Sequence, residues 1–446
     1  MSHLRDRLNE AGLSYESAAA AVRRVAAEHG DQLRTNKSAI AHWVAGNHTP
    51  DARTVVYLCE ALSRRLGRRI TPIDVGLGDQ LGDDLMPRDA VGAVARLGRA
   101  DVDRRGFLTG AVYSLGALAL PVDYKVDAAA RSEAAGRGRV GAAEVETVRE
   151  ITAVFNAADE RLGGGFGRSA VVEYLASDVA RYCDAQMTAD VRAQMFSEAA
   201  QLAYLAGWKA HDIGSEGLAQ RYYLHSYQLA IEAGETGQAA YVMRILAHQA
   251  YDLGHHDNCI GLASAAVRTT AGRVDDHTAA LFSLTLAKAH AMKGDRREAL
   301  TALARAELQM QQARDGDERP RWAGIHGTSP AQFHNHTAKV LADLGEHAAA
   351  EAHFATAIRD GLDPVSKPRV YALSQTWLAE AQVRQGHLDQ ACETWGSALD
   401  RFGGIQSNRA RDAVKSMRGH LAPFRRRGVR AVAQLDARGR ELLAAA

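Results

Sequence analysis

The stretch ADLGEHAAAEAHF, residues 342–354, contains the pattern that decides the fold of this chain. A turn glycine is followed five positions later by a small residue. Four positions further on comes a residue that is bulkier in most copies, and three positions after that another small residue. Four other stretches follow the same order: HDIGSEGLAQRYY (211–223), YDLGHHDNCIGLA (251–263), AMKGDRREALTAL (291–303) and VRQGHLDQACETW (383–395). Their turn glycines are about forty residues apart, with one longer step: Gly214, Gly254, Gly294, Gly345 and Gly386.

The pattern has a physical cause in the packing of antiparallel helices. Two helices approach closely only where small side chains lie at their crossing, and glycine gives the turn between them its backbone freedom. The order resembles the tetratricopeptide repeat (TPR), in a version slightly longer than the standard period. That resemblance implies stacked hairpins in a right-handed superhelix, with a concave groove lined chiefly by the first helix of each pair. We expect an all-α chain with a TPR-type α-solenoid over residues 146–402 and capping helices over 403–446.

Helical register predicts which side chains face this groove. The candidates for ligand binding are Tyr204, Trp208, His211, Tyr241, Arg244, His248, Tyr251, Lys288, Asn335, Lys339, Thr376 and Glu380. Cationic or potentially cationic groups among aromatic rings suit an anionic ligand or the C-terminal carboxylate of a peptide, and Asn335 suits a peptide backbone. A peptide and a small molecule both remain open. The alternative is a solvated concave face whose rings only pack between hairpins.

The first eighty residues read as short helices separated by turns. Two stretches, GLSYESAAAAV (12–22) and TNKSAIAHWVAGNHTPDARTVVYLCEAL (35–62), resemble the lambda-repressor-like (XRE-type) DNA-binding family. The resemblance covers roughly residues 3–78, so we expect a helix-turn-helix domain over residues 1–78. It departs from the family at EHGDQLR (28–34), which makes the connection before the recognition helix longer than usual.

In that family the recognition helix enters the major groove by its N-terminal end. The resemblance assigns DNA contacts to Arg34, Asn36, Lys37, Ser38, Ala41, His42 and Arg53, the two arginines facing phosphates. Asn can pair with adenine, and Lys with guanine or a phosphate. Residues 1–78 carry eleven basic and eight acidic side chains, a net charge of only +3, so a merely solvated helix is the alternative. Trp43, Val55, Leu58 and Leu62 are expected to be core.

An apolar stretch, DRRGFLTGAVYSLGALALP (103–121), has the ingredients of a twin-arginine export signal but lies far inside the chain. Further along, GGGFGRSAVVEYLASDVARY (163–182) followed by LAYLAGWKAHDIGSEGLAQRYYLHSYQLAIEAG (202–234) is similar to a large actinobacterial regulator family with an XRE-type N-terminus and a TPR C-terminus. Members of that family carry a comparable stretch between the halves. We therefore expect residues 79–145 to be a linker whose apolar helix packs against the solenoid.

Composition excludes several classes of protein. The 54 basic and 53 acidic residues nearly cancel, and no run reaches the ~20 apolar residues that span a bilayer. The four cysteines form no CxxC pair, which argues against a disulfide framework or a zinc site and favours the cytoplasm. Catalytic signatures such as GxSxG and HExxH are absent, so we expect no enzyme activity, no cofactor and no metal.

Two functions fit this organisation. The first is a ligand-responsive transcriptional regulator that binds operator DNA as a homodimer, since one such domain reads only a half-site. Helix-turn-helix proteins with TPR domains include the peptide-pheromone receptors of Gram-positive bacteria, which suggests quorum sensing. The second is a TPR protein-interaction scaffold whose helix-turn-helix no longer binds DNA.

Overall fold

The computed structural model describes most of the 446 residues. The described residues are 3–28, 31–77, 86–87, 89–102, 113–118, 120, 138–314, 319–324 and 329–445. Within these ranges all regular structure is helical, apart from one isolated bridge between Arg139 and Gln186, so the all-α prediction is confirmed there. No helix in the described ranges combines the length and the apolarity needed to cross a lipid bilayer. All four cysteines are buried free thiols.

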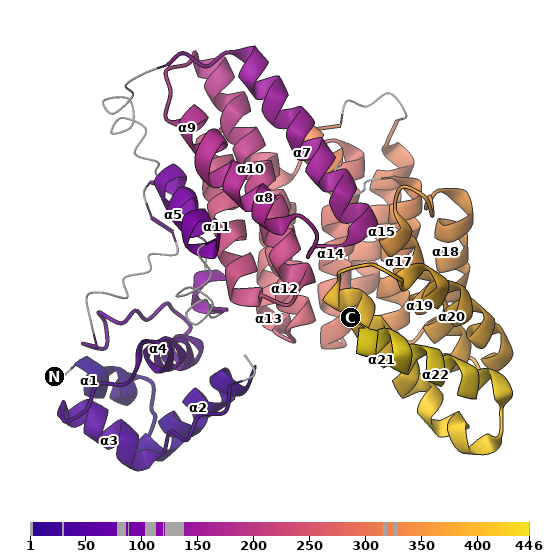
Figure 1. The fold of residues 1–446 in the computed structure, drawn as a ribbon, viewed down its shortest axis with the longest axis horizontal. Helices are drawn as coiled ribbons and strands as arrows, with labels where there is room; N and C mark the ends of the chain where they lie inside the picture. The colour runs from indigo at the N-terminus through magenta and orange to yellow at the C-terminus, as the bar shows by residue number, and fades with distance from the viewer. Residues whose placement is uncertain are drawn as a thin grey trace.

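The N-terminal region folds into four helices around a core of its own (Figure 1). These helices are α1 (His3–Glu10), α2 (Tyr15–Glu28), α3 (Lys37–Ala45) and α4 (Ala52–Leu66). Ile40 and Leu62 have no exposed surface, and Trp43, Val55 and Leu58 are buried with them. The predicted core positions are therefore confirmed.

Capping residues determine where α3 and α4 begin and end. The side chains of Asn36 and Asp51 each accept a hydrogen bond from a backbone amide in the first turn of the helix that follows. Both helices end at glycines with a left-handed backbone conformation, Gly46 at φ 74° and Gly67 at φ 65°. Residues with a side chain rarely adopt this conformation, so glycine is favoured at both ends. The lengths of these two helices thus follow from local sequence.

Residues 90–102, in the span predicted to be a linker, form a helix that belongs to the larger helical body. This helix, α5 (Ala90–Val102), packs against α8 (Arg168–Tyr174), the π-helical turn η2 (Leu175–Val179) and α11 (Glu216–Glu232). Arg168 donates two hydrogen bonds to buried Asp101, at 2.5 and 2.9 Å, and the Tyr222 hydroxyl donates a third at 2.9 Å. These hydrogen bonds hold α5 against the hairpins.

The predicted repeats form five helical hairpins, which lie side by side in Figure 1. The pairs are α10 (Ala189–Asp212) with α11, α12 (Thr236–Asp252) with α13 (His256–Thr270), α14 (Asp276–Lys293) with α15 (Arg296–Gln312), α17 (Pro330–Asp343) with α18 (His347–Asp360), and α19 (Pro368–Arg384) with α20 (Leu388–Phe402). All five turn glycines have positive φ angles, between 78° and 89°. The repeat pattern therefore corresponds to one structural unit each time it occurs.

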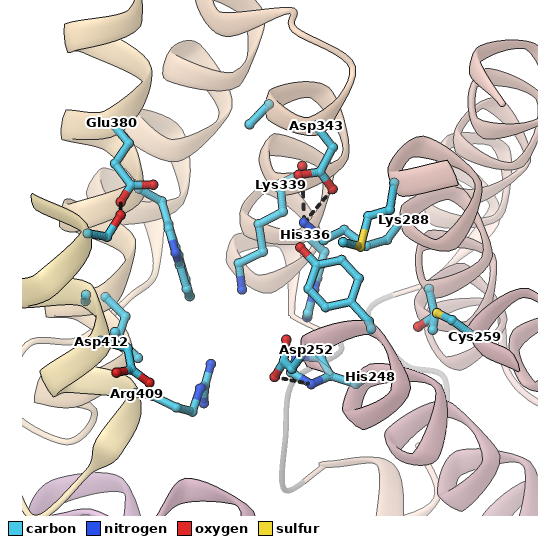
Figure 2. A pocket seen from close by; sticks show the side chains of 18 of the residues that line it. His248, Asp252, Cys259, Lys288, His336, Lys339, Asp343, Glu380, Arg409 and Asp412 are labelled. Carbon is cyan, nitrogen blue, oxygen red and sulfur yellow. Dashed lines mark hydrogen bonds and ion pairs between the residues drawn. The ribbon is translucent and has the colours of Figure 1, made fainter. Parts of the chain in front are cut away.

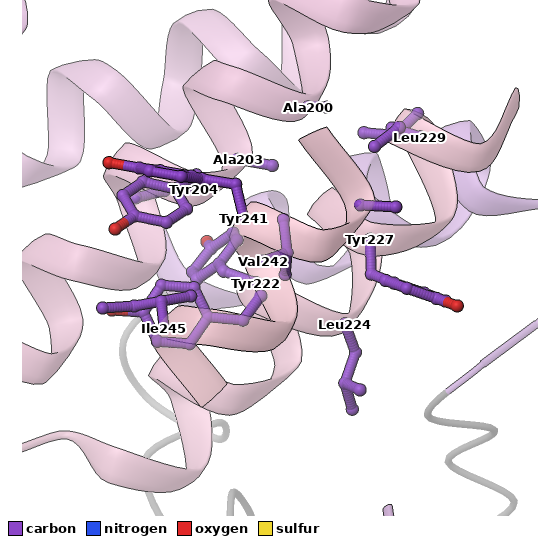
Figure 3. Close-up of a cluster of buried hydrophobic side chains, with 14 of the residues drawn as sticks. Ala200, Ala203, Tyr204, Tyr222, Leu224, Tyr227, Leu229, Tyr241, Val242 and Ile245 are labelled. Atoms are coloured by element: carbon purple, nitrogen blue, oxygen red, sulfur yellow. The ribbon is translucent and has the colours of Figure 1, made fainter. Parts of the chain in front are cut away.

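Small residues do lie where the paired helices cross. Ala219, Ala299, Ala350 and Ala391 have no exposed surface, and Cys259, at the same position of the second hairpin, is 2% exposed. At Gly207 on α10, an added Cβ would lie only 2.7 Å from the ring of Tyr223 on α11. Tyrosine rings fill the space between the first two hairpins, as Figure 3 shows.

The longer step between the third and fourth repeats contains an additional short helix, α16 (Arg321–Gly324). This helix packs against α10 and α12, away from its neighbours in sequence. The ring of Trp322 lies 5.6 Å from that of Tyr241, and its atoms come within 2.8 Å of where a Cβ on Gly237 would lie. The insertion thus covers one edge of the first two hairpins.

A buried ionic network joins the first hairpin to the fifth. Arg369 on α19, 1% exposed, pairs with Asp159 at 2.6 Å and with Asp212 on α10 at 3.0 Å. Asp159 belongs to the long helix α7 (Ala142–Leu162), which contacts both α10 and α19. Lys209 pairs with Asp159 at 3.2 Å, and the Ser407 hydroxyl donates to Asp212. The two ends of the row of hairpins are therefore held together.

The C-terminal residues form α21 (Asn408–Leu421), the 3-10 turn η3 (Ala422–Arg427) and α22 (Arg430–Ala445). Helix α21 packs on α19, and α22 packs on α20 and α21, so they cover the end of the fifth hairpin. Two further helical pieces, α9 (Ala180–Cys183) and η1 (Gly116–Leu118), complete the described elements.

The described end of the twin-arginine-like stretch lies between the N-terminal helices and the hairpins. The Tyr113 ring stacks on His255 at 5.7 Å, and the Leu115 amide donates to Glu60 on α4. Gln220 on α11 accepts from the amide of Ser114 and donates to its carbonyl. Only η1 is helical in this part, and residues 103–112, 119 and 121 lie outside the described ranges. The described part is thus a bridge between the two regions.

Candidate functional site

A cavity of about 1010 Å³ lies among the inner helices of the hairpins (Figure 2). Its walls come mainly from α10, α12, α14, α17 and α19, the first helix of each pair, together with α21. Ligand sites in proteins typically enclose about 300–1,000 Å³. The space therefore suffices for a small molecule or for a short peptide.

Three of the cationic side chains that line this cavity lie against aromatic rings rather than against carboxylates. In the described part of the chain, no carboxylate forms an ion pair with Arg244, Lys339 or Arg409. Each lies against an aromatic ring instead: Arg244 is 4.6 Å from the centroid of Tyr241, and Lys339 is 3.7 Å from that of Trp377. Arg409, from α21, is 4.9 Å from the centroid of a third ring. The cavity therefore presents positive charge and aromatic surface together.

Lys288, in the same wall of the cavity, is a lysine that does have a carboxylate partner. Lys288 pairs with Asp343 at 2.8 Å and lies over the ring of Tyr251. Lys339, one turn before Asp343 on the same helix, has no such partner. Burial and the positive charges of Arg409 and Lys288 hold the pKa of the Lys339 amine well below its usual value. An anion bound beside Lys339 would reverse that effect by favouring its charged form.

Two histidines and two carboxylates form a compact cluster at one side of the cavity. His211 Nε2 is 3.1 Å from Asp252 Oδ2, and His248 Nδ1 is 3.3 Å from the same oxygen. His211 Nδ1 is 2.9 Å from a carboxylate oxygen of Glu216. Burial opposes charge on His211, but Glu216 and Asp252 raise its pKa to about 10. Burial outweighs Asp252 at His248 and lowers the pKa of that imidazole to about 3.

Most of the predicted groove residues meet this space. Seven of the twelve line the main cavity: His211, Arg244, His248, Tyr251, Lys288, Lys339 and Glu380. Three more line an adjoining pocket of about 80 Å³: Tyr204, Trp208 and Asn335. Within that group Asn335 is 2% exposed, and its side-chain oxygen accepts a hydrogen bond from Ser374, so its freedom to bind a peptide is limited.

The other two predicted groove residues lie in the packing between helices. Tyr241 is 2% exposed, because the inserted helix α16 places Trp322 against its ring. Thr376 is 1% exposed, and its hydroxyl donates to the carbonyl of Leu373 in the same helix. Helical register places both toward the inner side of their helices, but neighbouring side chains cover them.

Sequence reasoning missed four residues that line both the main and the adjoining pocket: His336, Leu373, Trp377 and Arg409. His336 and Trp377 each directly follow a predicted groove residue, so a wider arc of each helix faces the cavity than register counting assumed. Arg409 lies on α21, a helix expected only to cap the stack. No local signal in the sequence shows that α21 folds back along the cavity.

The N-terminal region presents most of the predicted DNA-contact residues at its surface. Arg34, Asn36, Lys37, Ser38 and His42 are exposed, and Ala41 is half-buried. They lie just before α3 or in its first two turns. The side-chain oxygen of Asn36 is occupied as the α3 cap, at 3.0 Å from the Ala39 amide, which leaves only its NH₂ group for another contact.

Arg53 differs from the other predicted DNA contacts. Its Nε is 2.6 Å from Asp31 Oδ2 and donates to the Tyr57 hydroxyl at 3.0 Å. Asp31 belongs to the connection that the sequence showed to be longer than usual. Contact between Arg53 and a phosphate would compete with this ion pair.

Comparison with known proteins bears on the N-terminal region. Residues 4–78 match the family described as the SP15 N-terminal domain. The match covers α1–α4 and the turn that follows them. No curated protein shows a significant match to this chain.

Proposed function

We propose that this protein is a ligand-responsive transcriptional regulator. Its N-terminal region is a lambda-repressor-like helix-turn-helix domain that binds operator DNA as a homodimer, and its hairpins form a TPR-type solenoid that binds an anionic signal. The observation that carries the proposal is the group Arg244, Lys339 and Arg409, which lack carboxylate partners in the described chain. Arg244 is buried with the Tyr204 hydroxyl as its hydrogen-bond partner, and Lys339 and Arg409 are half-buried. An anion entering the cavity therefore gains charge-assisted hydrogen bonds from groups that no carboxylate neutralises.

The DNA side of the proposal is supported by the surface around the start of α3. Lys37, Ser38 and His42 are exposed side chains able to donate to base edges or phosphates. The first turn of a helix also offers free backbone amides to a phosphate oxygen. Two such domains in a homodimer would read two half-sites about one helical turn of DNA apart.

A physical route joins the cavity to the DNA-binding region. Glu216 in the cavity lies one turn from Gln220 on α11, and Asp252 lies three residues before His255. Gln220 and His255 hold the segment that begins at Tyr113, and this segment also contacts α4 through Glu60. A ligand that moves the end of α12 or the start of α11 would therefore shift α4. Such coupling needs a ligand that binds the two positions of this segment with different affinity.

Selection of genomic DNA fragments with the full-length protein tests the DNA side. We expect enrichment of a site with two half-sites and binding that weakens steeply as salt rises. Lys37→Ala should lower affinity and reduce the salt slope by about one. Lys415→Ala, an exposed lysine of α21 paired with Asp412, is the matched control and should leave both unchanged.

Mass spectrometry of small molecules and peptides that co-purify with the native chain tests the ligand side. A molecule with a negative charge should be retained by the wild-type protein and lost from Arg244→Met and Arg409→Ala. If no DNA fragment is enriched at low salt and one protein co-purifies instead, the interaction-scaffold hypothesis replaces the regulator. The paired Arg53 and the modest basic charge of the N-terminal region are the features that favour that second function.

A further inference from the structure

The cluster formed by His211, His248 and Asp252 has the geometry of a metal site. One donor atom from each residue lies within 4.8 Å of the other two. The contacts of Asp252 Oδ2 are 3.1 Å to His211 Nε2 and 3.3 Å to His248 Nδ1. Zinc bonds of about 2.0–2.1 Å in a tetrahedron place neighbouring ligand atoms ~3.3 Å apart. These two separations therefore already match two edges of a zinc coordination polyhedron.

The elements that carry the three side chains make the arrangement rigid. His248 and Asp252 are one turn apart on α12, and His211 lies in the last turn of α10. The two imidazole rings meet edge to face, with an interplanar angle of 88°, and one nitrogen of each lies with a carboxylate oxygen of Asp252 around one point. A cation at that point needs little rearrangement of the backbone.

The surroundings of His211 supply the outer partner that metal-bound histidines require. Its other ring nitrogen, Nδ1, lies 2.9 Å from Glu216, which fixes the tautomer that leaves Nε2 free for a metal. Glu216 is itself held by Gln249, whose side-chain amide donates to it at 2.7 Å. A carboxylate bonded to a ligating imidazole raises its basicity and aims the ring.

We infer that His211, His248 and Asp252 bind a divalent transition-metal ion of the zinc class, with Glu216 positioning His211. The ion takes the place of the proton shared by His211 Nε2 and Asp252 Oδ2. Two imidazoles and one carboxylate prefer zinc, cobalt or nickel to the oxygen-seeking magnesium and calcium. Three protein ligands leave a fourth position, which faces the cavity. The inference does not rest on the proposed function, because neither DNA nor an organic ligand takes part.

Positive charges nearby oppose a cation at this site, and that of Arg409 acts on His248 more strongly than that of Arg244. The guanidinium of Arg409 acts electrostatically on both His248 and Asp252. Removing that charge should tighten metal binding, whereas it should weaken binding of an anionic molecule. Arg409→Ala thus moves the two kinds of binding in opposite directions, so failure of one idea can be told from failure of the other.

Zinc and cobalt titrations of the full-length, tag-free protein test the site. We expect one Zn²⁺ per chain, no saturable Mg²⁺ binding, and a Co²⁺ complex with the intense visible absorption of tetrahedral coordination. His248→Ala and Asp252→Asn should each lower zinc affinity by more than the ten- to hundredfold that loss of an outer partner costs, and Glu216→Gln by about that amount. His347→Ala, which removes another cavity histidine outside the cluster, is the control and should bind zinc as wild type does.

Two results would overturn the site. The first is a wild-type chain that binds no zinc stoichiometrically. The second is zinc binding that survives in both His248→Ala and Asp252→Asn, which would place the ion elsewhere. Circular dichroism of the metal-free variants checks that they are folded, and Arg409→Ala, which keeps every ligand, provides the variant whose expected change is a gain.

Discussion

Replacement of Arg369 by alanine should destabilise the helical body strongly. Its guanidinium is 1% exposed and pairs with Asp159 and Asp212, two carboxylates with no exposed surface. Without it, Asp159 keeps Lys209 at 3.2 Å, whereas Asp212 keeps hydrogen bonds from Ser407 and a backbone amide and a weaker attraction to Lys209. Removing one partner of a buried ionic group typically costs about 3–5 kcal/mol, because the charges left behind cannot be rehydrated.

Hydrogen exchange of the full-length protein is the assay that resolves this loss. A chain of this size need not unfold in one step, so local opening free energies are more informative than a single midpoint. Protection should fall most in α7 and α19, which Arg369 joins. Arg359→Ala is the matched control: that guanidinium is 68% exposed and pairs with its neighbour Asp360, so its loss should cost less than ~1 kcal/mol.

The Arg359→Ala control also defines the result that would refute this reasoning. If Arg369→Ala changes protection in α7 and α19 no more than Arg359→Ala does, the network contributes nothing and the reasoning fails.

Burial raises the pKa of Asp159, but Arg369 and Lys209 outweigh it and hold this pKa below its usual value. A depressed carboxylate pKa stabilises the fold above the unfolded value near pH ~4 and loses that contribution as the pH falls. Asp159→Asn should therefore flatten the acid limb of the stability curve.

Three further tests, with five substitutions in all, each probe a single contact. Gly207→Ala places a Cβ 2.7 Å from a buried ring and should cost about 1–3 kcal/mol in thermal or urea unfolding, whereas Gly261→Ala, with nothing within 4 Å, should stabilise α13 by up to ~1 kcal/mol. Asn36→Ala should cost about 1 kcal/mol through the lost cap, whereas Asn36→Ser should keep the cap but still lose DNA affinity in a binding titration. Tyr113→Ala should leave DNA and ligand affinities nearly intact when each is measured alone, but abolish the effect of one on the other. Equal stability of Gly207→Ala and Gly261→Ala, or of Asn36→Ala and Asn36→Ser, would contradict the packing or the capping argument. Coupling between DNA and ligand binding that survives Tyr113→Ala would contradict the proposed route.

Local sequence signals predicted the repeating part of the fold well. The turn glycines and small residues recur at fixed offsets because each hairpin solves the same packing problem within about forty residues. All five glycines have the positive φ that their position in a turn implies. The caps of α3 and α4 are equally local, since Asn36 and Asp51 act within their own helices. Ten of the twelve groove residues meet the two pockets for the same reason: helical register is a local property.

Long-range packing decided what sequence reasoning could not reach. The span expected to be a linker contains α5, whose place depends on Arg168 and Tyr222 meeting Asp101 from far along the chain. Tyr241 is covered because the long step between repeats returns to the first two hairpins.

The amino-acid sequence by itself determined the helices, the hairpin units and the inner face of each first helix. Only the tertiary structure decided that α21 brings Arg409 to the cavity, that α7 joins the first hairpin to the fifth through Arg369, and that His211 meets His248 and Asp252. The physical reason is the range of the interactions. Turns, caps and helical periodicity act over a few residues, whereas a cavity and its charges exist only once distant helices have packed together.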